Sequence, residues 1–147
     1  MSVIFRKLRA GLGFRPAEWA MFFEALVALI LSWIRIQFIS PKRWASRLLD
    51  SDPDYSSEPS EEQRETTRRV AKAVSRVVRN APVKLVCLPQ AMAARWMLRR
   101  RGIAPKMYIG APLIRDEESE FHAWLKLGDQ WIVGHCDESK YAVFDQQ

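Results

Sequence analysis

Hydrophobic residues first gather at positions 16–39, where Pro16 opens a stretch without further proline or glycine. Proline is favoured in the first helical turn, so this pattern predicts a long helix over residues 16–39. The helix is apolar on most sides and must be covered by the domain, a partner chain or lipid. Its uninterrupted apolar run is shorter than the roughly 20 residues that cross a bilayer, which favours a buried or interfacial helix over an anchor.

Two further helices follow a polar segment rich in acid, serine and proline, which predicts a linker over residues 51–60. Ser60 begins a capping-box sequence, and valines at helical spacing predict an amphipathic helix over residues 61–79. A third helix is expected over residues 91–101 because Pro89 and Gly102 punctuate its two ends. Cys87 then lies at a helix N-terminus or one residue before it.

Strand patterns occur only after these helices. Three short segments rich in aromatic and branched residues predict strands over 106–111, 121–127 and 130–134. The last two are separated by turn residues and form an expected hairpin. Because helices come first and strands last, we expect an α+β fold with an antiparallel sheet, preceded by an N-terminal helical segment.

Composition fits one folded domain. The chain has 147 residues, 48% of them apolar and 27% charged, which suffices for one hydrophobic core. We expect a helical segment over residues 1–50, the linker over 51–60 and the main domain over 61–147. A formal charge of +6 and a pI near 9.7 favour acidic partners.

Several classes of function lack their sequence signatures. Two cysteines, Cys87 and Cys136, are too few for a disulfide framework, and no zinc-site spacing occurs. We therefore expect no metal and a reducing, cytoplasmic location. The absence of a Gly-rich phosphate loop predicts no cofactor. No recognition helix or base-stacking motif stands out, so nucleic acid is not an expected partner.

The candidate nucleophile is Cys87. A helix N-terminus stabilises a thiolate through its free N–H groups and the helix dipole, and these groups could also bind an oxyanion. The alternative is an ordinary small residue packed beneath the helix. His122, 35 positions downstream on an expected strand, is the candidate general base, although a hydrogen-bonded structural histidine would give the same pattern.

A third residue is needed to orient the imidazole. If residues 128–129 form a two-residue turn, His122 falls opposite His135, and Asp137 lies diagonally nearby on the same face. Asp137 is the better candidate, because a carboxylate stabilises the imidazolium that forms. A one-residue change in register would turn both away, and a solvated acid is the alternative for Asp137.

Several of these segments together resemble the lasso-peptide B-protein family, the transglutaminase-like leader peptidases of lasso-peptide biosynthesis. The similarity covers residues 60–145 and rests on Cys87 to Ala93, Leu98 to Ile103, Tyr108 to Gly110, His122 to Leu125 and Ile132 to Gly134. The resemblance implies a transglutaminase-like, papain-like cysteine peptidase core. It matches Cys87 to the nucleophile and His122 to the general base. The family's third member, an aspartate, usually lies where this chain has Gly134, which leaves Asp137 or His135 as substitutes.

The resemblance also implies partners. A peptidase of this kind cuts the leader from a ribosomally made precursor so that a separate cyclase can close the macrolactam. The N-terminal part lacks the strand-rich pattern of a recognition domain, which implies a split system with a leader-recognition protein in trans. A basic segment could face an acidic leader or serve as a solvated helix face: Arg95, Arg99, Arg100, Arg101 and Lys106.

Two other functions use the same residues differently. An amine could accept the acyl group in place of water, which would make the chain an acyltransferase. A non-catalytic binding module could use its basic surface and the helix over 16–39 to tether partners of a peptide-maturation complex. Contact of residues 16–39 with a membrane surface is compatible with the peptidase hypothesis.

Overall fold

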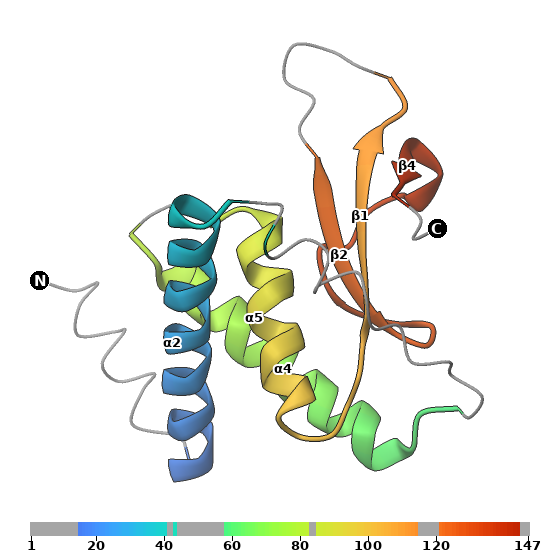
Figure 1. The fold of residues 1–147 in the computed structure, drawn as a ribbon. Helices are drawn as coiled ribbons and strands as arrows, with labels where there is room; N and C mark the ends of the chain where they lie inside the picture. The colour runs from blue at the N-terminus through green and yellow to red at the C-terminus, as the bar shows by residue number, and fades with distance from the viewer. Residues whose placement is uncertain (1–14, 41–42, 44–57, 83–84, 115–120, 145–147) are drawn as a thin grey trace, which may run out of the picture.

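The computed structural model describes residues 15–40, 43, 58–82, 85–114 and 121–144. Most of the expected linker over 51–60 lies outside these ranges. Within them the chain forms three helices, a four-stranded antiparallel sheet and one 3₁₀ turn, the expected α+β architecture (Figure 1). In chain order these are α2 (Pro16–Phe38), α4 (Glu61–Asn80), α5 (Cys87–Arg99), β1 (Lys106–Pro112), β2 (His122–Leu127), β3 (Gln130–Val133), η1 (Glu138–Lys140) and β4 (Tyr141–Val143).

Helix α5 lies at the centre of the fold, between α2 on one side and the sheet on the other (Figure 1). It begins at Cys87, so this residue lies at a helix N-terminus as predicted, and it ends at Arg99, two residues before the expected end. Small residues let both neighbours approach closely: Ala91, Ala93 and Ala94 are each fully buried. Helix α5 therefore fixes its own N-terminus against strand β2.

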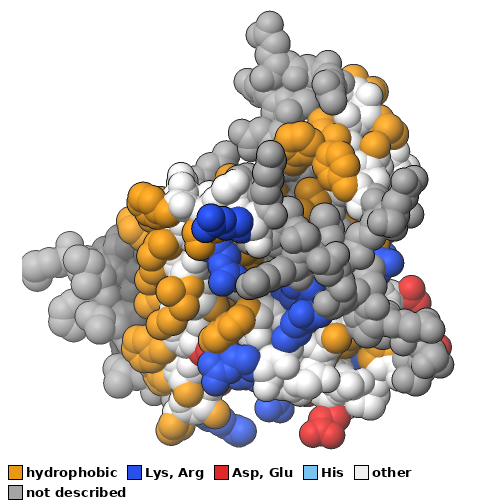
Figure 2. Space-filling model, viewed as in Figure 1, with side chains coloured by type: hydrophobic (Ala, Val, Ile, Leu, Met, Phe, Trp, Pro, Cys, Tyr) orange, Lys and Arg blue, Asp and Glu red, His pale blue; other side chains and the backbone are white. Residues whose placement is uncertain are grey.

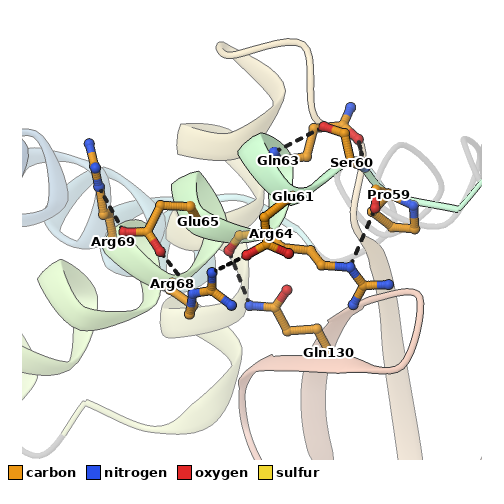
Figure 3. A network of polar contacts seen from close by, with 9 residues as sticks. All are labelled: Pro59, Ser60, Glu61, Gln63, Arg64, Glu65, Arg68, Arg69 and Gln130. Atoms are coloured by element: carbon orange, nitrogen blue, oxygen red, sulfur yellow. Dashed lines mark hydrogen bonds and ion pairs between the residues drawn. The ribbon is translucent and has the colours of Figure 1, made fainter.

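Helix α4 begins with the predicted capping box (Figure 3). The Ser60 hydroxyl accepts the Gln63 N–H at 3.2 Å, and the Gln63 side chain accepts the Ser60 N–H at 2.9 Å. Val70, Val74 and Val77 form its buried stripe, as the helical spacing predicted. Gln130 in β3 donates to the Arg64 carbonyl at 3.3 Å, which ties the hairpin to this helix.

Helix α2 packs one side against α4 and α5. Ala25, Ala28, Leu29 and Ser32 are buried, while its other side remains apolar and exposed. The prediction of a long helix here is confirmed. By length and composition α2 could also cross a membrane, a weak indication that core helices and signal sequences share.

The strand order in the sheet is β3-β2-β1-β4. The predicted hairpin turn is confirmed, because Leu127 lies opposite Gln130. An irregularity between Leu125 and Lys126 then shifts the register by one residue, so that Leu125 lies opposite Val133. The expected pairing of His122 with His135 is therefore wrong, since β3 also ends at Val133. Strand β4 and η1 have no counterpart among the sequence predictions.

The two faces of the sheet have different coverings. Ala123, Leu125 and Leu127 pack into the core with the helices. Trp124 is fully buried on the opposite face, where Tyr108 stacks on it at 5.5 Å between ring centroids. Its indole N–H donates to Glu138 at 2.8 Å. The segment that carries η1 and β4 thus closes the outer face beside His122.

Candidate active site

The first turn of α5 presents Cys87 with free backbone donors. The residue before the helix is Val86, whose apolar side chain accepts no hydrogen bond from the first-turn N–H groups. Pro89 has no N–H, so the free donors of the first turn are those of Cys87 and Leu88. Gln90 fixes the approach to the helix by donating to the Leu85 carbonyl at 2.8 Å. These N–H groups could bind an oxyanion that forms beside the sulfur.

The Cys87 sulfur lies beside a part of β2 that β3 leaves unpaired. Ala123 donates its N–H to Sγ at 3.4 Å, and Sγ lies 4.0 Å from the Phe121 carbonyl oxygen. Ile109, opposite Ala123, directs its carbonyl away from β2, toward the N–H of Phe144. In an antiparallel ladder Ala123 must then direct its own N–H toward the β3 side. The sulfur accepts a hydrogen bond that a longer β3 would have accepted.

The His122 ring is held by a carbonyl and two aromatic rings. Its Nε2 lies 2.9 Å from the Gly134 carbonyl oxygen. Tyr141 and Trp124 stack on the ring at centroid distances of 5.3 and 6.0 Å. These contacts fix the ring plane and use one ring nitrogen.

Cys87 and His122 therefore belong to the same end of β2. The sulfur contacts the main chain on both sides of His122, and the imidazole reaches toward Gly134 just past β3. The hydrogen-bond partners of Sγ within the described part of the chain are main-chain groups and not the imidazole. Catalytic hydrogen bonds are often long in ligand-free enzymes and tighten when substrate binds, so this geometry is compatible with a thiol–imidazole pair.

Gly134 has a conformation and an environment that admit no side chain. Its φ of +74° lies in the left-handed region, and a Cβ there would stand 2.3 Å from the Ala123 carbonyl oxygen. The close approach of the two main chains is what brings the Gly134 carbonyl within reach of His122.

The two candidate orienting side chains have other contacts. Asp137 caps η1: its carboxylate accepts the Ser139 hydroxyl at 2.6 Å and the Ser139 N–H at 3.2 Å. These hydrogen bonds, led by the hydroxyl, lower the pKa of Asp137. His135 is exposed and packs against Trp131 at 4.6 Å between ring centroids. A role for Asp137 or His135 in orienting His122 stays a prediction.

The second cysteine, Cys136, lies just past β3 beside two acidic residues. Burial, followed by the nearby carboxylates of Glu138 and Asp137, raises the pKa of Cys136. Both cysteines are free and half-buried. Within the described ranges no group of three His, Cys, Asp or Glu side chains is arranged to hold a metal.

Comparison with known families shows the superfamily of this domain. A profile of the transglutaminase-like superfamily matches residues 30–145, more than three quarters of the chain, including Cys87 and His122. The chain belongs to the transglutaminase-like superfamily. This superfamily includes cysteine peptidases. No curated protein and no solved structure matches the chain.

Sequence reasoning missed two groups that contact His122. Tyr141 lies in a strand of three residues, too short to show an alternating pattern. The Gly134 carbonyl is a main-chain group that every residue has, so the side-chain types in the sequence do not predict its contact with His122. A glycine directly after an apolar strand was the available signal, because it permits a sharp main-chain turn.

Proposed function

We propose that this chain is a cysteine peptidase that removes the leader from a ribosomally made lasso-peptide precursor. The supporting observation is the position of the Cys87 sulfur at the N-terminus of α5. It lies 3.4 Å from the backbone nitrogen of Ala123, the residue that follows His122 in β2. Superfamily membership and the resemblance of the Cys87 and His122 segments to leader peptidases support the same chemistry.

The proposed reaction is acyl transfer to water. His122 takes the Cys87 proton, and the thiolate attacks the last leader carbonyl, whose oxygen becomes an anion facing the Cys87 and Leu88 N–H groups. The C–N bond breaks, the amine of the core peptide leaves with the proton from His122, and a thioester remains. Water then loses a proton to His122 and attacks the thioester. The leader leaves as a carboxylic acid, and the proton returns to sulfur.

The test is leader release from a precursor, followed by mass spectrometry with the recognition partner present. Cys87→Ala and His122→Ala should each lose on the order of a thousandfold or more of the rate. Cys136→Ser, the matched control, should cleave like the wild type, because its thiol takes no part. Retention of full cleavage by Cys87→Ala would overturn the proposal, and transfer of the leader to an added amine instead of water would make the chain an acyltransferase.

Two protein partners belong to this proposal: a separate leader-recognition protein and a macrolactam-forming cyclase. All strands in the described ranges follow residue 105, so no strand-rich recognition element precedes the catalytic part there. Cleavage by the chain alone should therefore be much slower than cleavage with the recognition protein added. Equal rates with and without that protein would contradict a split system.

The exposed side of α2 supports a second, compatible role at a membrane surface (Figure 2). Orange apolar side chains run along this helix in the space-filling view, and Phe23, Leu31 and Phe38 are 54%, 55% and 78% exposed. Trp19 and Trp33 stand near its two ends, as aromatic residues do at lipid headgroups. The net charge of +6 is complementary to anionic lipid.

Vesicle co-sedimentation tests this contact. The protein should bind vesicles that contain phosphatidylserine, and binding should weaken when Leu31→Glu is introduced on the exposed side of α2. Leu113→Glu is the matched control, because Leu113 is 62% exposed but lies beyond β1. Equal binding by both variants would show that the exposed side of α2 does not contact lipid. Dimer formation by the wild type in place of vesicle binding would assign this side of α2 to a protein interface.

A further inference from the structure

The hydrogen bond between His122 and Gly134 determines which ring nitrogen carries the proton. A carbonyl oxygen can only accept, so Nε2, 2.9 Å from that oxygen, must be the donor. A neutral imidazole has one N–H, and Nδ1 is then left with its lone pair. The ring is thus prepared to take a proton at Nδ1.

The same contact stabilises the charged ring. When His122 takes a proton, Nε2–H becomes a charged donor, and its hydrogen bond to the Gly134 oxygen strengthens. The stacked Tyr141 and Trp124 rings keep the imidazole in the plane that this bond requires. Orienting a base and stabilising its protonated form are the two tasks of a third catalytic residue.

Within the described part of the chain, the two side chains predicted for these tasks have other contacts. Asp137 accepts two hydrogen bonds from Ser139 and pairs with Lys140 at 3.8 Å. His135 packs on Trp131. Position 134 could hold no side chain in this conformation, because a Cβ would collide with the Ala123 carbonyl.

We infer that the main-chain carbonyl of Gly134 is the third member of the catalytic group, with Gly134 as a positioning residue that sets the tautomer of His122. The inference rests on the proposed peptidase function for its consequence in catalysis. The tautomer itself can be measured without substrate, so the two can fail separately.

The first experiment is two-bond ¹H–¹⁵N NMR of the imidazoles in the full chain. The chain has two histidines, so in His135→Phe all imidazole signals come from His122. Above the pH at which the ring becomes neutral, His122 should show the Nε2–H tautomer. An Nδ1–H tautomer, or the mixture typical of a free imidazole, would overturn the inference whether or not the chain cleaves peptides.

The second experiment weakens the carbonyl without adding a side chain. Phenyllactate in place of phenylalanine at position 135 converts the amide between residues 134 and 135 into an ester, whose carbonyl is a poorer acceptor. The loss of part of a hydrogen bond corresponds to a roughly three- to tenfold fall in the rate of leader cleavage. The rate of Cys87 alkylation by iodoacetamide should fall with it, and its pH profile should shift.

The matched control places phenyllactate at position 129, where the ester alters the Gly128 carbonyl in the hairpin turn. This protein should cleave and be alkylated at the same rates as a protein with phenylalanine at position 129. An unchanged alkylation profile and cleavage rate for the ester at position 135 would show that the carbonyl does not assist His122. Equal losses at both positions would also overturn the inference, because they would reflect a general effect of the ester.

Gly134→Ala gives an independent measure. The added methyl should displace the carbonyl and lower cleavage by about a hundredfold, the order expected for a misplaced catalytic group. Gly128→Ala shares a positive φ of +57° but has only Pro59 atoms near its Cβ, at 3.6 Å, so it should stay active. A folded Gly134→Ala protein with wild-type activity and the wild-type His122 tautomer would refute the inference.

Discussion

Glu24 in α2 and Arg101, just beyond α5, form a bidentate ion pair. Arg101 Nη1 lies 2.9 Å from Glu24 Oε1, and Nη2 lies 2.6 Å from Oε2. The Arg101 guanidinium also donates to the Met97 carbonyl at 2.8 Å. The pair therefore fastens the end of α5 to α2, on the opposite end of the helix from Cys87. Its side chains are only 20% and 28% exposed.

The first prediction concerns the pH dependence of this pair. The hydrogen bond from Arg101 lowers the pKa of Glu24, so its stabilisation is fully present above the ordinary carboxyl pKa and is lost as pH falls through the lowered value. Glu24→Gln should lower the free energy of unfolding at pH 7 by about 1–2 kcal/mol. In urea titrations the difference from wild type should shrink below pH 4.5, the ordinary value. A pH-independent difference would contradict the prediction, and Glu62→Gln, at an exposed position of α4, should change the stability little.

The second prediction concerns the buried indole of Trp124. Glu138→Ala removes the acceptor of its N–H and leaves a buried donor unsatisfied, which should cost about 1–3 kcal/mol. Glu138→Gln keeps an oxygen in place and should cost less, although both changes remove the ion pair with Lys126 at 3.1 Å. Thermal unfolding of the two variants measures the difference. Equal losses would mean that Lys126, and not the indole, accounts for the effect.

The third prediction concerns Gly110, where β1 passes beneath two aromatic residues. A Cβ at this position would stand 3.0 Å from Tyr141 Cβ and 3.1 Å from the Trp124 ring. Gly110→Ala should therefore displace β4 and lower the free energy of unfolding by about 1–3 kcal/mol. Because Tyr141 stacks on His122, the variant should also broaden the His122 NMR signals. Leu113→Ala, on an exposed residue after β1, should change neither property.

The fourth prediction compares two serines of the α4 segment. Ser60→Ala removes half of the capping box and should destabilise the protein by about 1 kcal/mol. Ser75→Ala replaces an exposed serine within the same helix and should be neutral or slightly stabilising, since alanine is the better helix former. Chemical denaturation distinguishes the two. A Ser60→Ala protein as stable as the wild type or more stable would mean that the cap contributes nothing.

Local signals predicted most of the fold. Pro16, the Ser60 capping box and Gly102 mark helix ends because each acts through its own backbone or side chain. The hairpin turn was predicted for the same reason, and Leu127 does lie opposite Gln130. Each of these features depends on residues close together in the sequence.

The candidate site depended on longer-range geometry, which the sequence alone could not supply. The irregularity between Leu125 and Lys126 moves the register by one residue, and apolar residues on both strands permit either alignment. The position of Cys87 beside β2 follows from the packing of α5 on the sheet, and the contact between Gly134 and His122 from a main-chain turn. Residue types suggested Cys87 and His122 as candidates for nucleophile and base, but not the main-chain oxygen that contacts the His122 ring.

The hydrogen bond between His122 and Gly134 has a consequence for how this site would respond to acid. A carboxylate in that place would acquire a proton at low pH and cease to support the imidazole, whereas an amide oxygen carries no ionisation over the range in which proteins stay folded. The contact that orients the His122 ring should therefore persist in acid for as long as the protein stays folded.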